Sequence, residues 1–315
     1  MNDVVITGIG LVTPFGTGKK FLLSALESAS RVTPHKLPAL NNTVIQDQLV
    51  GTIPDLEVAV KQLPRKLVKF MSTAAIIGCL AGKEACEEAT IGQRFEPERV
   101  GIFTATGLTS ENFDFAPEIL KVSLDEKGTF SEKLFGKVGL KLLNPLNSFK
   151  ILPNMPPCIL SIVLGIKGPN LIFNPWAGQA GAALLEGWRA VHQGEVDCAV
   201  VGAADNPAAA SAVVYLKQMG LLSGAEFPSA AGAYLVFENR ARAEKDHVQV
   251  YGVIEKIAVS RSAEKAYDPL TPILGRTFAA AAPVLLATMC LGLPRPATLI
   301  DHRGTSCSFQ FRQTI

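Results

Sequence analysis

The sequence has no marked excess of positive or negative charge. Its 30 Lys and Arg residues nearly balance 28 Asp and Glu residues, which leaves a formal net charge of +2. Proteins that bind nucleic acid by releasing counterions need concentrated positive charge, so we expect no nucleic-acid partner. Recognition of other partners should depend on shape.

Long uninterrupted hydrophobic runs are lacking too, although the mean hydropathy is positive at +0.26. No stretch of 18 or more residues is free of both charged residues and turn formers, so the sequence predicts no membrane span. Residues Met1–Asp3 carry no basic segment and precede only a short apolar run, unlike a signal peptide. We therefore expect a cytoplasmic protein.

Cysteine and histidine are few and scattered. The six cysteines include no Cys-x-x-Cys pair, and the four histidines lack the spacing of metal ligands. The cysteines are expected to be reduced and buried. Gly8–Thr13 lacks the third glycine of a dinucleotide-binding fingerprint, and Gly16–Lys20 lacks the Ser or Thr that ends a phosphate-binding loop. The sequence therefore predicts no metal and no other cofactor.

Apolar residues, by contrast, make up 48% of 315 residues, which is enough for a large core. Strand-like runs alternate with helix-like segments, a pattern typical of α/β proteins. The expected helices include Leu67–Glu88 and Ala180–Val191, and residues 38–64 and 121–150 look like surface excursions. The expected strands are Val4–Ile9, Val100–Ala105, Leu171–Phe173, Cys198–Val201, Ala233–Phe237, Val248–Val253 and Phe309–Phe311.

The segment Val4–Gly16 resembles the opening of β-ketoacyl synthases, the condensing enzymes of fatty-acid and polyketide synthesis. Similar segments follow in the family's order over nearly the whole chain: Glu98–Phe103, Leu152–Met155, Gly168–Asn170, Gly194–Asp205 and Gly304–Ser308. The resemblance implies the thiolase-like α/β fold, in which two similar halves pack as five αβαβα layers with buried helices between the sheets.

The C-terminal half looks abridged, because the chain is shorter than a usual family member. On this basis we expect an N-terminal thiolase-like half over residues 1–245 and a shortened C-terminal half over residues 246–315. The shortening falls between about Ser262 and Gly275.

The resemblance also locates the chemistry that a condensing enzyme needs. The family's nucleophile is a Cys at the start of a buried helix, where the helix dipole stabilises the thiolate that accepts an acyl chain. Alignment without gaps from Gly168–Asn170 places Ala177 at this position. A local shift of two residues would place Gln179 there instead, similar to the glutamine-bearing loop of chain-length factors, the inactive partners of type II polyketide ketosynthases.

Two histidines complete the family's reaction centre. The His-Gly-Thr-Gly-Thr motif that carries the first does not occur in this sequence, and the second is matched by Arg276, whose guanidinium stays charged and cannot exchange a proton near neutral pH. Its position calls for a carboxylate or carbonyl partner, and a structural ion pair is the simplest expectation. The gating Phe of the family's glycine-rich loop is matched by His302.

Further residues are candidates for shaping an acyl channel or a subunit interface. They are Leu108, Phe113 and Phe115 in the loop after the Val100 strand, Met155, and Trp176 beside the nucleophile position. Phe113 and Phe115 would share a face if extended. For each of these residues, ordinary core packing is the competing interpretation.

The resemblance therefore implies a noncatalytic ketosynthase-like subunit similar to chain-length factors. It would form a heterodimer with an active ketosynthase and meet the acyl carrier protein through that complex, in polyketide or polyene synthesis. Two alternatives stay open. One is an enzyme of altered activity, either a malonyl-carrier decarboxylase using Gln179 or a hydrolase using His302 with Asp301; the other is a structural homodimer.

Overall fold

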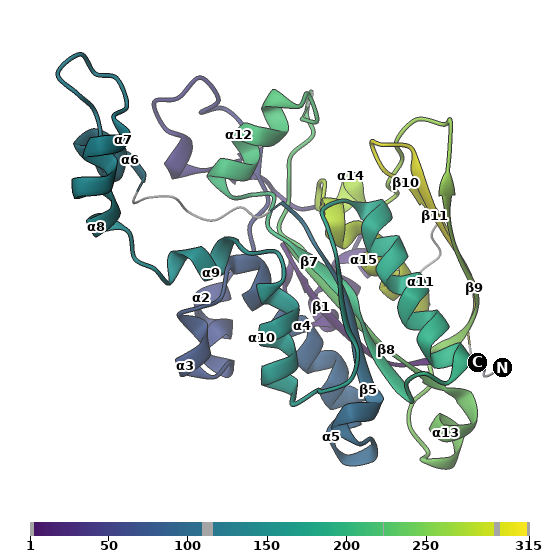
Figure 1. Cartoon of the computed structure of the whole chain (residues 1–315). Helices are drawn as coiled ribbons and strands as arrows, with labels where there is room; N and C mark the ends of the chain where they lie inside the picture. Colours follow the sequence, from purple (N-terminus) through teal and green to yellow (C-terminus); the bar gives the residue numbers. More distant parts are fainter. Residues whose placement is uncertain (1–2, 109–115, 223, 293–296, 314–315) are drawn as a thin grey trace.

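One large mixed sheet organises the protein. The computed structural model describes residues 3–108, 116–222, 224–292 and 297–313. The strand order is β10-β11-β9-β1-β8-β7-β5-β6, and β2 pairs with β1 (Figure 1). β5 runs parallel to β6 and β7, whereas the other pairings in this sheet are antiparallel. A short β3–β4 pair lies apart.

The strands are β1 (Val4–Thr13), β2 (Gly16–Thr17), β3 (His35–Lys36), β4 (Leu49–Val50), β5 (Val100–Thr106), β6 (Asn170–Phe173), β7 (Cys198–Asp205), β8 (Ala231–Asn239), β9 (Gly252–Arg261), β10 (Thr298–Ile300) and β11 (Thr305–Gln313). All seven expected strands occur. The expected Val248–Val253 strand was wrong at its start, because β9 begins only at Gly252. Four strands, β2, β3, β4 and β10, were not foreseen.

The larger helices are α1 (Lys19–Glu27), α4 (Thr73–Glu88), α6 (Ala116–Val122), α10 (Met155–Leu164), α11 (Ala177–Gln193), α12 (Ala210–Gln218), α13 (Arg240–Lys245) and α15 (Ala281–Cys290). Short ones are α2 (Leu56–Ala59), α3 (Arg65–Val68), α5 (Ile91–Arg94), α7 (Glu132–Leu134), α8 (Leu140–Leu142), α9 (Asn147–Ile151), α14 (Thr271–Leu274) and the 3-10 turn η5 (Phe278–Ala280). Within the described ranges no helix combines the length and apolar character needed to cross a membrane.

The expected helix Leu67–Glu88 is two helices. α3 ends at Val68, and α4 begins after Ser72, whose hydroxyl accepts a hydrogen bond from the N–H of Ala75 at 3.1 Å. A serine at this place satisfies one of the N–H groups that the first turn leaves unpaired, so the helix starts there.

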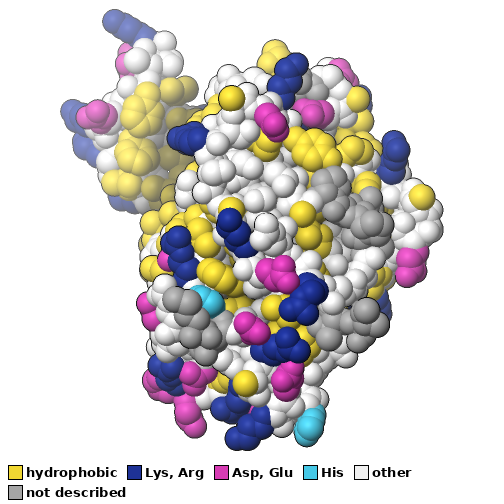
Figure 2. All heavy atoms as spheres, turned by 90° about the vertical axis from the view of Figure 1, so that its right-hand side faces the viewer, with side chains coloured by type: hydrophobic (Ala, Val, Ile, Leu, Met, Phe, Trp, Pro, Cys, Tyr) yellow, Lys and Arg dark blue, Asp and Glu magenta, His cyan; other side chains and the backbone are white. Residues whose placement is uncertain are grey.

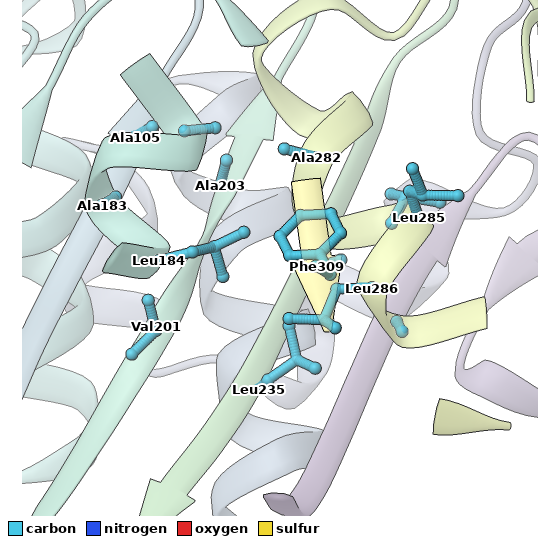
Figure 3. Close-up of a cluster of buried hydrophobic side chains, with 14 of the residues drawn as sticks. Ala105, Ala183, Leu184, Val201, Ala203, Leu235, Ala282, Leu285, Leu286 and Phe309 are labelled. Atoms are coloured by element: carbon cyan, nitrogen blue, oxygen red, sulfur yellow. The ribbon is translucent and has the colours of Figure 1, made fainter. Parts of the chain in front are cut away.

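Helices cover both faces of the strands β1, β8, β7 and β5. α4 and α10 pack on one face, and α11 with α15 pack on the other, between these strands and the β9–β11 arm (Figure 1). The close-up in Figure 3 shows Leu184 of α11 beside Val201 and Phe309 beside Leu286. The core therefore has four layers: helices α4 and α10, the strands β1, β8, β7 and β5, helices α11 and α15, and the β9–β11 arm of the same sheet.

Small residues let α11 lie between the two arms of the sheet. A Cβ on Gly187 would lie 2.4 Å from a methyl of Val201 in β7, and one on Gly181 would lie 2.7 Å from the Sγ of Cys307 in β11. Larger side chains would force the layers apart. The Gly- and Ala-rich sequence of this helix thus fits its burial between the two arms.

No helix of the described residues packs on the far side of the β9–β11 arm. Side chains there are exposed and polar, including Lys256, Ser260, Gln310 and Arg312. Figure 2, which views the molecule from this side, shows charged side chains of both signs spread over the face. This uncovered arm is consistent with the expected shortening of the chain relative to its family. Since β9 pairs with β1, one continuous sheet crosses the proposed boundary at residue 245, and the division into halves stays a prediction.

Candidate functional site

A cavity of about 330 Å³ lies where the start of α11 meets the turn between β10 and β11. Its apolar wall includes Trp176, Ala177, Phe278, Ala281, Leu299 and Ile300, and its polar wall includes Glu226, Asp268, Arg276, Asp301 and His302. The three positions that sequence similarity assigned to lost catalytic or gating groups, Ala177, Arg276 and His302, thus meet in one pocket.

Ala177 is the first residue of α11, and it is buried in the pocket wall. Gln179, two residues later, is exposed and does not line the cavity. A side chain at position 177 would sit at the positive end of the helix, as an activated nucleophile requires. The methyl group present there offers no nucleophile.

None of the six cysteines, all of which the structure describes, lines this pocket. Five are buried and Cys158 is half-buried. Burial raises the pKa of the Cys79 and Cys307 thiols to about 12. These thiols therefore stay protonated and behave as small apolar side chains, as the sequence predicted.

Arg276 is held by two neighbours away from α11. Its Nη1 donates to the carbonyl of Leu221 at 2.7 Å and to the Glu226 carboxylate at 3.2 Å. Its guanidinium also lies 5.0 Å from the ring centre of Phe278. The expected ion pair is therefore present, and the guanidinium has a fixed orientation at the pocket wall.

Trp176 fills the space beside Ala177. The indole is 3% exposed, lies edge-on to the His302 ring at 4.2 Å between centroids, and has the Arg303 guanidinium 5.4 Å from its ring centre. Phe278 packs against it at 6.0 Å. Burial lowers the pKa of His302, with Arg276 and Arg303 acting in the same direction and Asp301 against them. His302 is therefore a neutral ring packed on an aromatic neighbour.

Asp301 directs its carboxylate at backbone N–H groups. Oδ2 accepts from Gly178 at 3.0 Å, and Oδ1 accepts from Arg303 and Thr305 at 2.9 Å each. Within the described residues, the Nε2 atom of His302 has no hydrogen-bond partner. The Asp–His pair that a hydrolase would use is thus not formed in this arrangement.

Asp205 is a buried acid that sequence reasoning gave no role. It ends β7, and its Oδ2 accepts from the N–H of Ala279 at 3.1 Å, while Oδ1 is buried and has no hydrogen-bond partner among the described residues. Burial raises the pKa of this carboxyl to about 8. The bond fixes the turn at Phe278, whose φ of 45° is rare for a bulky residue. In the sequence, the acidic residue that ends an apolar strand could have indicated the role of Asp205.

The remaining predicted channel residues lie elsewhere. Leu108 lines a narrow crevice with Pro153 and Pro156, and Met155 begins α10 and packs against the core on the α4 side of the sheet. Phe113 and Phe115 lie outside the described residues. Within those residues, no group of three or more His, Cys, Asp or Glu side chains could hold a metal ion.

Comparison with known proteins gives the family. Residues 1–234 match the family model described as "Beta-ketoacyl synthase, N-terminal domain". The chain belongs to the β-ketoacyl synthase family. The match covers most of the chain, including β1, α11 and the strand that carries Asp205.

Two curated family members illustrate how far the similarity extends. The chain is 27% identical over 173 residues to 3-oxoacyl-[acyl-carrier-protein] synthase 1 of Buchnera aphidicola subsp. Baizongia pistaciae, covering 54% of this chain and 39% of that protein. It is 22% identical over 207 residues to 3-oxoacyl-[acyl-carrier-protein] synthase 2 of Staphylococcus aureus (strain COL), covering 65% and 46%. The chain thus spans less than half the length of these relatives.

Solved structures confirm the thiolase-like fold. A chain of the AntDE:AntF structure, described as a type II PKS acyl-carrier protein in complex with its ketosynthase, superposes with a TM-score of 0.78 at 14% identity and 100% coverage of both chains. The ishigamide ketosynthase/chain length factor superposes with a TM-score of 0.74 at 15% identity, covering 99% of this chain and 100% of that one. At such identities the likeness defines the fold alone.

Proposed function

We propose that this ketosynthase-family chain is a noncatalytic subunit comparable with chain-length factors. It pairs with an active ketosynthase, meets the acyl carrier protein through that complex and closes one side of the acyl channel in polyketide or polyene synthesis. The observation that carries the proposal is the composition of the pocket at the start of α11. Ala177, Arg276 and Trp176 meet where the family places its nucleophile and its histidine.

The chemistry of these side chains supports a noncatalytic role. Forming an acyl-enzyme requires a nucleophile, and position 177 carries a methyl group. Proton transfer during condensation requires a group whose pKa lies near the working pH, whereas the guanidinium of Arg276 stays protonated. Trp176 packs against Phe278 and His302 beside this position, where we infer that the indole would obstruct an entering acyl chain. The pocket therefore suits a structural part better than a reaction centre.

Exposed apolar side chains favour a large protein partner. β6 is an edge strand of the sheet, and its Leu171 is 45% exposed. On the neighbouring α10 and its entry segment, Ile162 is 63% exposed and Leu152 43% exposed. An unpaired strand edge flanked by apolar side chains is suited to pairing with another chain. We infer that the ketosynthase docks along this edge.

The experiment is to offer acyl groups to the chain with and without a ketosynthase. The purified chain is incubated with malonyl- or acyl-loaded carrier protein, alone and after co-expression with a full-length ketosynthase of the same organism. The intact mass of every polypeptide is then measured by mass spectrometry. We expect co-purification, with acyl adducts on the ketosynthase only.

Other outcomes would contradict the proposal. Stoichiometric acylation of the isolated chain would show that it carries a nucleophile. Acetyl product from the isolated chain would indicate a decarboxylase, and free acid would indicate a hydrolase. Co-purification that fails while the chain forms a stable homodimer would favour a purely structural protein. The Ala177→Ser variant is the matched control, because it places a hydroxyl at the start of the helix and adds only one heavy atom.

A further inference from the structure

The turn between β10 and β11 presses on the first turn of α11. Asp301 stands at the junction and is 9% exposed. Its Oδ2 accepts from Gly178 N at 3.0 Å, which ties the turn to the helix, while Oδ1 accepts from Arg303 N and Thr305 N at 2.9 Å each, which closes the turn on itself. One carboxylate thus holds three backbone donors.

The contact leaves no room for another group. A Cβ on Gly178 would lie 2.5 Å from the Cβ of Thr305 and 2.8 Å from Oδ2 of Asp301. The next residues of the turn cover Trp176, since His302 packs edge-on against the indole and Arg303 lies over it. The carboxylate is therefore sealed against the helix.

The start of a helix is where an anion gains most from backbone donors. Its first N–H groups have no partner within the helix, and the aligned peptide dipoles place partial positive charge there. Such donors stabilise a thiolate or the oxyanion of acyl transfer when they are free. In this protein one donor of the first turn of α11, the N–H of Gly178, is already hydrogen-bonded to the carboxylate of Asp301.

We propose that Asp301 is a built-in anion that occupies the start of α11 and keeps this pocket from stabilising a thiolate or an oxyanion. The contact is autoinhibitory: the loss of the nucleophile at position 177 and the occupation of the helix start are two separate barriers to acyl transfer. The inference concerns the chain itself and stands whether or not a partner ketosynthase exists.

The test installs a thiol as a reporter. Ala177→Cys is made in the full chain, alone and together with Asp301→Asn, which keeps the size of the side chain and removes its charge. Alkylation of position 177 by iodoacetamide is followed from pH 5 to pH 10 by peptide mass spectrometry, which separates this thiol from the native cysteines. We expect the thiol to titrate about one pH unit or more lower in the double variant.

A matched control separates this contact from the general charge of the pocket. Asp268 lines the same cavity, but its carboxylate accepts from Leu270 N and Thr271 Oγ1 and not from α11. Ala177→Cys with Asp268→Asn should shift the titration by clearly less. The other charged or titratable groups that surround the pocket, Glu226, Tyr267, Arg276, His302 and Arg303, stay unchanged. An equal shift in both double variants, or no shift with Asp301→Asn, would overturn the proposal.

A second measurement does not depend on the thiol. In Asp301→Ala the donors are left without their anion, so sodium formate should raise the melting temperature of this variant more than an equal concentration of sodium chloride does. The native protein should show no such difference between the two salts. A formate response that is the same in both proteins would also overturn the proposal.

Discussion

Position 205 shows how a single residue can link stability to pH in this fold. The carboxyl is buried, it accepts a backbone hydrogen bond from Ala279, and burial raises its pKa to about 8. Its folded pKa lies above its unfolded value near 3.8. The folded state therefore holds a proton that the unfolded state releases between these two values, so the contribution to stability is full below pH 3.8 and is lost as the pH rises toward 8.

We expect Asp205→Asn to remove this dependence. Between pH 5 and pH 8 the free energy of unfolding of the native protein should fall relative to that of the variant, by roughly 1.4 kcal/mol per pH unit at most. Urea unfolding of both proteins at pH 5, 6.5 and 8 measures the difference. Parallel curves at all three pH values would mean that Asp205 is already ionised in the folded protein.

Trp176 is the largest side chain beside the nucleophile position, and its removal tests whether it is an integral part of the packing. Trp176→Ala leaves a hole between Phe278 and His302, so we expect a loss of about 3–5 kcal/mol in the free energy of unfolding. Trp176→Phe keeps an aromatic ring in the same place and should cost clearly less. Denaturant melts of the two variants give the comparison, and equal losses would show that the indole is not specifically packed.

At the scale of elements, β11 has one face in the core and the other exposed to solvent. Cys307 and Phe309 point toward the helices and are buried, whereas Gln310 and Arg312 are exposed. A register shift falls beside Gln310 and Phe311, where β9 carries the extra residue Glu255, and the alternation of β11 continues with a partly buried Phe311. The strand thus contributes to the core with one face only, because no described helix covers the other.

This asymmetry predicts opposite responses from adjacent residues. Phe309→Ala should destabilise the protein by about 3–5 kcal/mol, because the ring packs in the cluster of Figure 3. Gln310→Ala should change stability by no more than about 0.5 kcal/mol. Urea unfolding measures both. A large loss with Gln310→Ala would indicate that something covers the outer face in solution.

In β1, side chains of a helix satisfy backbone N–H groups that no neighbouring strand pairs. β9 pairs only with Val4–Ile6 of β1, so the N–H groups farther along that edge need other partners. Two carboxylates of α4 supply them: Glu88 accepts from Ile9 N and Glu84 accepts from Leu11 N, each at 2.9 Å. Burial raises the pKa of Glu84. The helix therefore takes the place of a missing strand.

At the scale of the whole molecule, the edge strand with an exposed apolar side chain and the uncovered arm lie at opposite ends of the sheet. The β9–β11 end is polar and needs no cover, whereas the β6 end exposes Leu171 on its edge strand and Ile162 on the adjacent helix. Permanent interfaces bury apolar surface, so the β6 end is the one where a subunit should dock.

We therefore expect Leu171→Lys to weaken assembly without unfolding the chain. Co-purification with a co-expressed ketosynthase should fall at least tenfold, because a charge would be buried against the partner. Tyr215→Lys is the matched control, since Tyr215 is 47% exposed on α12. Circular dichroism checks the fold of both variants. Unchanged co-purification of Leu171→Lys would place the partner on another surface.

The sequence by itself determined the layered α/β architecture, because alternation of apolar runs and small-residue helices reports directly which segments must be buried. It did not predict α10, which begins Met155-Pro156-Pro157. Proline is tolerated in the first turn of a helix, where its missing N–H has no partner to lose. The start of β9 also escaped, since Val248 and Val250 pack in a small side cluster rather than in a strand.

For the site, the sequence placed Ala177, Arg276 and His302 as candidates because local motifs surround each of them. Only the tertiary structure showed that these three residues share one pocket and that Gln179 lies outside it. It also showed that the carboxylate of Asp301 accepts a hydrogen bond from the N–H of Gly178. A hydrogen bond across more than a hundred residues depends on how β11 and α11 pack against each other. Such packing follows from the fit of whole layers, which no local pattern of residues encodes.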